Sequence, residues 1–214
     1  MASERNRILN LIDYLETLNI EINWGKNKAQ GNKGFFRVKS NQYRIDISKD
    51  LSDTEALRVL VHEFAHYIHY KNDKTLKALD FLNTKIDDNI TEELISITVD
   101  SIPKETIEPL FNMQKELINN IKKIKSQNNS FLTKFELSSK QKILNRINAK
   151  ISRINRYYNS TTELFARSME KFILETNDFK NKAPALYKIY SEYITKDIIL
   201  LNFINNVKIK LEEL

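Results

Sequence analysis

The spacing of apolar residues divides this chain into a short β-containing part near the N-terminus and a long helical remainder. Apolar side chains in residues 4–18 recur at helical spacing, which predicts a helix. Residues 20–24 alternate apolar and polar side chains, as in a half-buried strand. Residues 35–40 and 43–48 are two more short segments with strand-like sequences, FFRVKS and YRIDIS, joined by a polar turn, which predicts an antiparallel hairpin. The pattern therefore indicates a small antiparallel sheet of about three strands.

Most of the remaining sequence has the periodicity of helices. Ser52 and Glu55 form the S-x-x-E capping-box pattern, so a helix is expected to start there and to run to about residue 70. Residues 176–183 are expected to be a loop. Further helices are predicted over 75–84, 89–101, 105–126, 135–158, 161–175, 184–194 and 196–211. Residues 105–158 read as a long helical-hairpin insertion within a single domain spanning residues 1–214.

Composition supports an α+β fold that is mostly helical. Glycine and proline occur only three times each, which argues against a β-sandwich with many turns, and the 41% apolar and 29% charged residues are ordinary for a globular protein. No apolar run approaches the roughly 20 residues of a membrane span. The charged, amphipathic N-terminus shows no signal peptide. We therefore expect a cytoplasmic protein with no membrane partner.

The chain is basic, with a net charge of +6, and its lysines are densest over residues 115–156. Such a charge permits attraction to nucleic acid or anionic surfaces. However, the sequence has no Arg-rich stretch, aromatic-interleaved RNA motif or helix-turn-helix pattern. The basic helix is therefore interpreted as a solvated face, and no nucleic-acid partner is expected.

All three histidines of the chain lie in "RVLVHEFAHYIHY", residues 58–70. His62 and His66 are four residues apart and so share one face of a helix, where both imidazoles can bind one metal ion. Glu63 follows His62 directly and is placed to accept a proton from a metal-activated water. His69 is rotated away from this face and is expected to line the cleft or support the site. Because there is no cysteine, the ligands must be histidines and carboxylates.

These residues predict a Zn²⁺ site that needs a third protein ligand, because a catalytic zinc ion usually has three and keeps one position open for water. The third ligand is expected to be a carboxylate from another helix, with Glu92, Glu93 and Glu163 as candidates. Ser160 and Glu163 also match the capping-box pattern. The residues alone therefore leave open whether Glu163 is a ligand or a helix cap.

Three stretches carry a resemblance to a known group: "HEFAHYIHY" (62–70), "ELFARSMEKFI" (163–173) and "APALYKIYSEYI" (183–194). They resemble the gluzincin metallopeptidases related to anthrax lethal factor and the Pro-Pro endopeptidases, and most of all the zincin-like peptidase domains of phages and mobile elements. The resemblance covers about residues 35–70 and 155–195. It implies a zincin-like fold, with His62, His66 and Glu163 as zinc ligands and Glu63 as general base.

Relatives also use a tyrosine shortly before the third ligand to stabilise the oxyanion. In the toxin-like members it stands seven residues ahead, which is the position of Arg156 here. The resemblance therefore implies Tyr157 in this role, with Tyr158 and Arg156 as alternatives. Two features differ from the group: His66 and Glu163 are 97 residues apart, more than in many relatives, and no signal peptide is seen. The ImmA-like peptidases match less well, because their close-following E-A-x-x-F-A segment is absent.

The function that follows is that of a zinc-dependent endopeptidase, which hydrolyses peptide bonds through a metal-activated water with Glu63 as general base. A protein or peptide substrate is expected to add as a strand along an edge strand within residues 35–48. The alternative is a zincin-fold partner-binding or regulatory protein of a mobile element with little or no protease activity.

Overall fold

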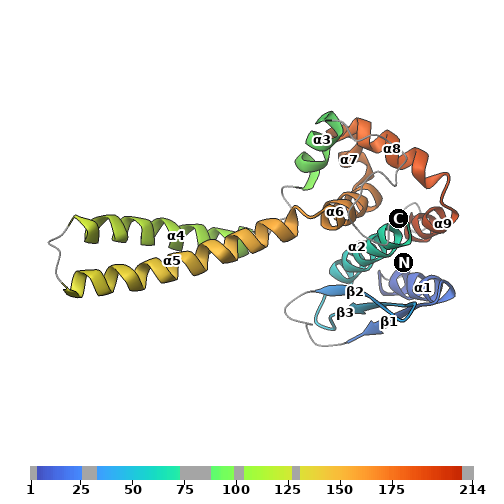
Figure 1. Cartoon of the computed structure of the whole chain (residues 1–214). Coiled ribbons are helices and arrows are strands. Elements are labelled where there is room, and N and C mark those ends of the chain that lie inside the picture. The colour runs from blue at the N-terminus through green and yellow to red at the C-terminus, as the bar shows by residue number, and fades with distance from the viewer. Residues whose placement is uncertain (1–3, 26–32, 73–87, 99–103, 127–130, 209–214) are drawn as a thin grey trace. The chain divides into compact units, whose positions relative to one another are not determined.

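The structure is a computed structural model that describes residues 4–25, 33–72, 88–98, 104–126 and 131–208. Most of these residues are helical, and three strands form one small sheet. The elements in chain order are α1 (Glu4–Thr17), β1 (Ile20–Trp24), β2 (Gly34–Lys39), β3 (Gln42–Ile47), α2 (Asp53–Asn72), α3 (Asp88–Thr98), α4 (Lys104–Lys125), α5 (Phe131–Tyr158), α6 (Thr161–Leu174), α7 (Thr176–Lys182), α8 (Pro184–Ile194) and α9 (Ile198–Lys208). Figure 1 labels each of them.

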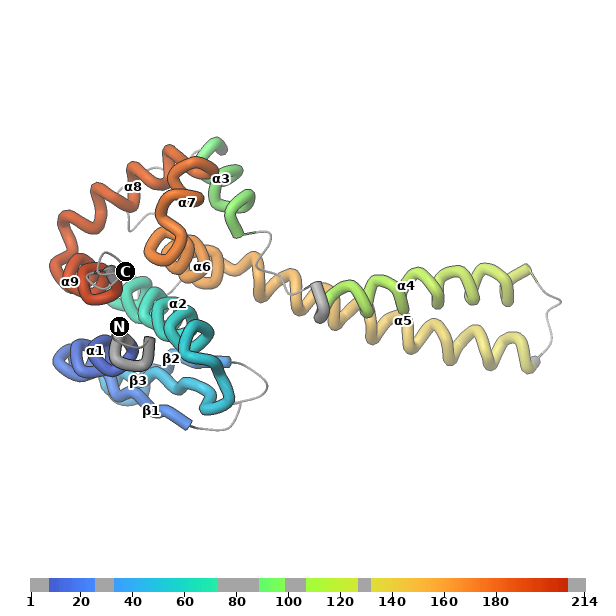
Figure 2. Tube along the Cα trace, turned by 180° about the vertical axis from the view of Figure 1, so that it is seen from behind, coloured from blue at the N-terminus to red at the C-terminus, as the bar shows by residue number. Residues whose placement is uncertain are grey.

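The chain divides into two compact units. The first comprises residues 1–98 and 161–214 and contains the sheet and most of the helices, and the second comprises residues 99–160. The second unit is the predicted helical hairpin, in which α4 and α5 run side by side, as both Figure 1 and Figure 2 show. Its small apolar cluster consists of Leu110, Leu117, Ile147, Ile151 and Ile154.

The sheet is mixed rather than antiparallel, which corrects the prediction from sequence. Strand β3 lies in the centre of the order β1-β3-β2, antiparallel to β2 and parallel to β1. The β2–β3 hairpin turns at Ser40 and Asn41, both with positive φ, as a two-residue hairpin loop requires. The nine residues 25–33 separate β1 from β2, enough chain to bring the two strands to opposite edges of β3. Sequence periodicity identifies a strand but not its neighbour.

Helix α2 begins with the predicted capping box. The backbone N–H of Ser52 donates to the Glu55 carboxylate, and the N–H of Glu55 donates to Ser52 Oγ. Leu60, Phe64 and Ile68 recur every four residues, so α2 has a continuous apolar face. This face is fully buried, and it leaves the histidine positions on another side of the helix.

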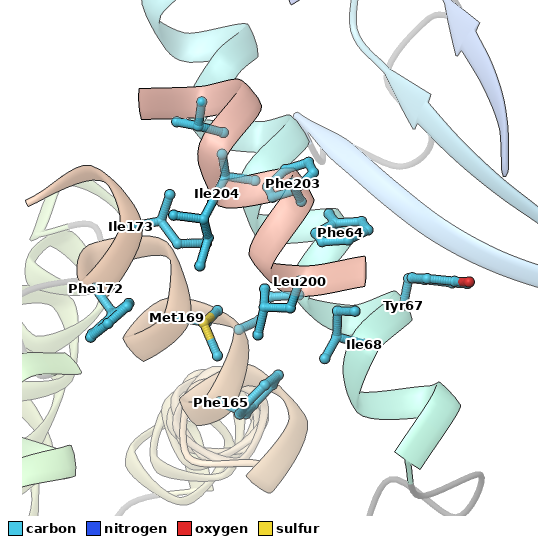
Figure 3. Close-up of a cluster of buried hydrophobic side chains, with 14 of the residues drawn as sticks. Phe64, Tyr67, Ile68, Phe165, Met169, Phe172, Ile173, Leu200, Phe203 and Ile204 are labelled. Carbon is cyan, nitrogen blue, oxygen red and sulfur yellow. The ribbon is translucent and has the colours of Figure 1, made fainter. Parts of the chain in front are cut away.

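The core that holds α2 comes from helices distant in sequence. Figure 3 shows Phe165 and Met169 of α6 facing Ile68 of α2, with side chains of α9 closing the cluster. The rings of Phe64 and Phe203 stack with centroids 3.8 Å apart. Because buried side chains interlock closely, this packing fixes α6 against α2 and thereby sets which polar residues of the two helices meet.

Two other expectations are resolved by the fold. Residues 176–182, expected to be a loop, form the short helix α7, because Phe179 is buried against Phe172 and Tyr190. A seven-residue helix with one apolar residue gives no periodic signal. The helix predicted over 75–84 lies outside the described residues. No helix in the described ranges is long and apolar enough to cross a membrane.

Candidate metal centre

Helices α2 and α6 bring together two imidazoles and one carboxylate. His62 Nε2 lies 3.6 Å from Glu163 Oε2, and His66 Nε2 lies 3.4 Å from Glu163 Oε1. Within the described ranges, these three side chains form the group in which each can offer a ligand atom within 4.8 Å of the others. Glu163 is 4% exposed, so its carboxylate is directed into the protein rather than into solvent. Of the alternatives left open by the sequence, the structure places Glu163 beside the histidines.

The distances fit a small tetrahedral metal ion. Two donor atoms that each lie about 2.05 Å from one zinc ion at the tetrahedral angle are about 3.3 Å apart. The two measured nitrogen–oxygen separations, 3.4 and 3.6 Å, are close to that value. Two histidine nitrogens and one carboxylate are also a common ligand set of catalytic zinc sites. The two distances run to different oxygens of Glu163, and one ligand atom from each of the three side chains lies within 4.8 Å of the others, so the residues present fit a zinc ion.

The other ring nitrogen of each histidine has its own partner. His62 Nδ1 lies 3.2 Å from Glu170 Oε2, and His66 Nδ1 lies 2.9 Å from the hydroxyl oxygen of Thr162. When each Nδ1–H donates to these oxygens, the lone pair of each Nε2 is free to bind a metal ion. A carboxylate behind a metal-binding histidine also fixes the orientation of the ring and makes the ligand more basic.

We expect Glu170→Gln to weaken zinc binding about 10- to 100-fold, the usual effect of losing such a partner. The amide keeps the size of the side chain but removes the negative charge next to His62. Competition with a chromophoric chelator measures the affinity. Glu192→Gln, an exposed change on α8, serves as the control and is expected to bind zinc like the wild type. Equal affinity in the two variants would contradict the role of Glu170.

Two arginines hold the carboxylates of this centre. The Arg167 guanidinium, one turn after Glu163 on α6, donates to Glu163 Oε2 at 2.9 Å. Arg58 donates to Glu170 Oε1 at 3.1 Å and also pairs with Glu175. Both carboxylates that face His62 are therefore held in fixed orientations by charged hydrogen bonds.

The electrostatics of the centre favour a cation at the point of convergence. Burial lowers the pKa of the His62 imidazole, but hydrogen bonds to Glu163 and Glu170 outweigh burial and raise this pKa to about 10. Burial raises the pKa of the Glu163 carboxyl, whereas hydrogen bonds to both imidazoles bring it below its ordinary value. A proton is thus held strongly where the donor atoms meet, the position that a divalent cation would take.

Glu63 is buried beside the two histidines and is held by the sheet. Its Oε2 accepts a hydrogen bond from the backbone N–H of Phe36 in strand β2, at 2.8 Å. Burial raises the pKa of the Glu63 carboxyl, although the two nearby imidazoles oppose the shift. A carboxylate of raised pKa accepts a proton more readily near neutral pH, as a general base must. Because β3 lies on the other side of β2, this N–H belongs to the outer edge of the three described strands.

Strand β2 approaches α2 so closely at Gly34 that a side chain has no room there. A methyl group on Gly34 would overlap the side chain of Val59 and lie 3.1 Å from Glu63 Oε1. Glycine at this position therefore permits the contact between β2 and Glu63.

We expect Gly34→Ala to lower the free energy of unfolding by about 1–3 kcal/mol, because the added methyl overfills a packed contact. To make room, the strand must move away from α2 or the side chains of Val59 and Glu63 must turn. Urea denaturation measures the free energy of unfolding. Lys39→Ala, an exposed change in the same strand, is the control and is expected to change stability little. Unchanged stability in Gly34→Ala would show that the contact is loose.

The other candidate ligands have different surroundings. Glu93 accepts the backbone N–H groups of Ala185 and Leu186 and so caps the start of α8, while Glu92 is exposed on α3. His69 is fully buried with its ring 5.1 Å from Phe165, so the expectation that it lines a cleft was wrong. The alternative capping box between Ser160 and Glu163 is not formed. The Glu163 carboxylate contacts the two histidines and Arg167, and the Ser160 hydroxyl donates to the carbonyl of Tyr157.

The residues suggested for the oxyanion belong to the other compact unit. Tyr157 is half-exposed in the last turn of α5, with its ring edge-on to Tyr158 at 5.2 Å. Arg156 is exposed on the same turn. The assignment of Tyr157, Tyr158 or Arg156 to oxyanion stabilisation therefore stays a prediction.

Sequence reasoning missed the residues that support the ligands, namely Thr162, Arg167, Glu170 and the backbone of Phe36. Part of the signal was present, because Arg167 and Glu170 follow Glu163 by four and seven residues and so share its helix face. Comparison with protein-family models, curated proteins and solved structures found no match. The gluzincin resemblance therefore stays a prediction.

Proposed function

We propose that this protein is a zinc-dependent endopeptidase. The observation that carries the proposal is the convergence of His62, His66 and the Glu163 carboxylate, whose ligand atoms lie within 4.8 Å of one another, with Glu63 buried next to them. A purely structural zinc site needs its ligands but has no use for a buried carboxylate beside them. Here the carboxylate of Glu63 is oriented by a backbone hydrogen bond, which gives it a defined place near the reaction centre.

A zinc ion bound by these ligands would supply Lewis-acid chemistry and lower the pKa of a water molecule in the site. Glu63 accepts the proton of that water as the water attacks the peptide carbonyl, and then delivers the proton to the leaving amine. The backbone N–H of Phe36 holds the carboxylate of Glu63 in place through a hydrogen bond to its Oε2. Glu170 and Thr162 hold the two imidazoles in the tautomer that binds the metal.

We place the peptide substrate along strand β2. Among the described strands, β2 is an edge of the sheet, and it is the strand that contacts Glu63. An extended peptide that pairs with this edge would gain backbone hydrogen bonds and pass the general base. Phe35 and Val38 of β2 are partly exposed and could contact substrate side chains.

The proposal is tested with a mixture of fluorogenic peptides and protein prepared with one equivalent of zinc. We expect cleavage that 1,10-phenanthroline abolishes and that added zinc restores. Analysis of the products by mass spectrometry identifies the scissile bonds. If zinc binds but no peptide or unfolded protein is cleaved, the peptidase proposal falls, and the alternative of a zinc-containing partner-binding protein takes its place.

A further inference from the structure

The positive charge of this protein is concentrated on the helical hairpin. The unit 99–160 contains twelve Lys and Arg and five Asp and Glu, a net charge of +7. The rest of the chain contains 22 basic and 23 acidic residues, a net charge of −1. The whole excess of the chain therefore belongs to a unit that contains none of the candidate metal ligands.

Within the hairpin, the basic residues of α5 form a stripe. Positions 142, 146, 150, 153 and 156 follow helical spacing and fall within about a third of the helix circumference. We call these five residues the α5 stripe: Lys142, Arg146, Lys150, Arg153 and Arg156. All five are exposed, and they extend over about 21 Å of helix. Ile147 and Ile151, on the opposite side of α5, are buried against α4.

The α5 stripe is not neutralised within the part of the chain that the structure describes. No described carboxylate pairs with any of its five members, and the one acidic residue of α5, Glu136, pairs instead with Lys140. Segments of like charge without counter-charges repel one another, which costs stability unless an anionic partner is bound. Asn145 and Ser152 lie exposed among the basic residues and add hydrogen-bond donors.

From this arrangement we propose that the outer face of α5 binds the phosphate backbone of nucleic acid. A line of cations about 21 Å long matches a partner with evenly repeated anions, and arginine, lysine, asparagine and serine are the side chains that contact phosphates. An amphipathic helix that binds a membrane surface needs an exposed apolar face along its length. Ile147, Ile151 and Ile154 of α5 pack in the cluster against α4, and the exposed apolar side chains of α5 lie before the α5 stripe or at its ends, at Leu132, Phe135, Ile143 and Tyr157. From the sequence, the charge permitted attraction to nucleic acid, but a solvated helix face was the preferred interpretation.

The test is fluorescence anisotropy of a labelled duplex of about 20 base pairs and random sequence, with the full-length chain at salt concentrations from about 50 to 200 mM. We expect the wild type to bind, with log K falling against log salt at a slope of about −4.5, because each of the five residues of the stripe makes one phosphate contact that releases roughly 0.9 counterion. The triple variant Lys142→Gln, Arg146→Gln, Arg153→Gln is expected to bind at least about tenfold more weakly and to lose about three units of that slope.

The matched control removes the same charge from the other unit, in the variant Lys49→Gln, Lys188→Gln, Lys196→Gln, whose three lysines are exposed. It is expected to keep the salt slope of the wild type. Circular dichroism checks that both variants keep their helices. No binding of the duplex at low salt would overturn the proposal, as would an equal loss in the control. Binding to anionic lipid vesicles without binding to the duplex would overturn it in favour of a membrane surface.

Discussion

Replacement of Glu163 by alanine is expected to reduce the zinc content from about one ion per chain to a small fraction of that. Among the described residues, Glu163 supplies the carboxylate whose oxygens lie 3.6 Å from His62 Nε2 and 3.4 Å from His66 Nε2. Without it, two imidazoles remain, and a zinc site with two protein ligands is far weaker than one with three. Elemental analysis of chains purified without added metal measures the content, and His62→Ala is expected to give the same loss.

Glu93→Ala is the matched control for this loss. Glu93 was another candidate for the third metal ligand, but its carboxylate caps α8. Its replacement is expected to leave zinc bound and to cost about 0.5–2 kcal/mol of stability, the usual cost of losing a helix N-cap. Retention of zinc by a folded Glu163→Ala variant, or loss of zinc from Glu93→Ala, would show that the three-ligand assignment is wrong.

Replacement of Glu63 by glutamine is expected to lower the rate of peptide cleavage by a factor of about 10² to 10⁴ while zinc stays bound. The amide has the shape of the carboxylate, and its oxygen can still accept the N–H of Phe36. It cannot accept the proton of the attacking water. The measurement is cleavage of a fluorogenic substrate, with the zinc content of the same sample determined in parallel.

The control for Glu63→Gln is Glu55→Gln on the same helix. Glu55 is exposed and belongs to the capping box, so its amide variant is expected to cleave peptides at the rate of the wild type. Together the two variants separate a role in the reaction from a general effect of charge on α2. A Glu63→Gln enzyme that cleaves as fast as the wild type would exclude Glu63 as general base and leave the zinc site without its proposed chemistry.

Local patterns predicted the secondary structure well where one periodicity extended over many residues. The capping box at Ser52 and the apolar repeat after it predicted α2, and the near-heptad repeat of residues 135–158 predicted α5. The failures involve elements whose signal is not local. Helix α7 depends on the burial of one side chain, Phe179. The parallel pairing of β1 with β3 depends on where the chain goes between two strands.

The sequence by itself determined the spacing of His62, Glu63 and His66, because four residues of an α-helix return to the same face whatever surrounds the helix. It could not choose the third ligand from its own residues, since Glu92, Glu93 and Glu163 all lie on distant helices. Tertiary packing decided this: the apolar faces of α2 and α6 interlock, and only that contact places Glu163 at the histidines and Glu170 behind them. Such a contact depends on side-chain fit across about a hundred residues of chain, which periodicity does not record.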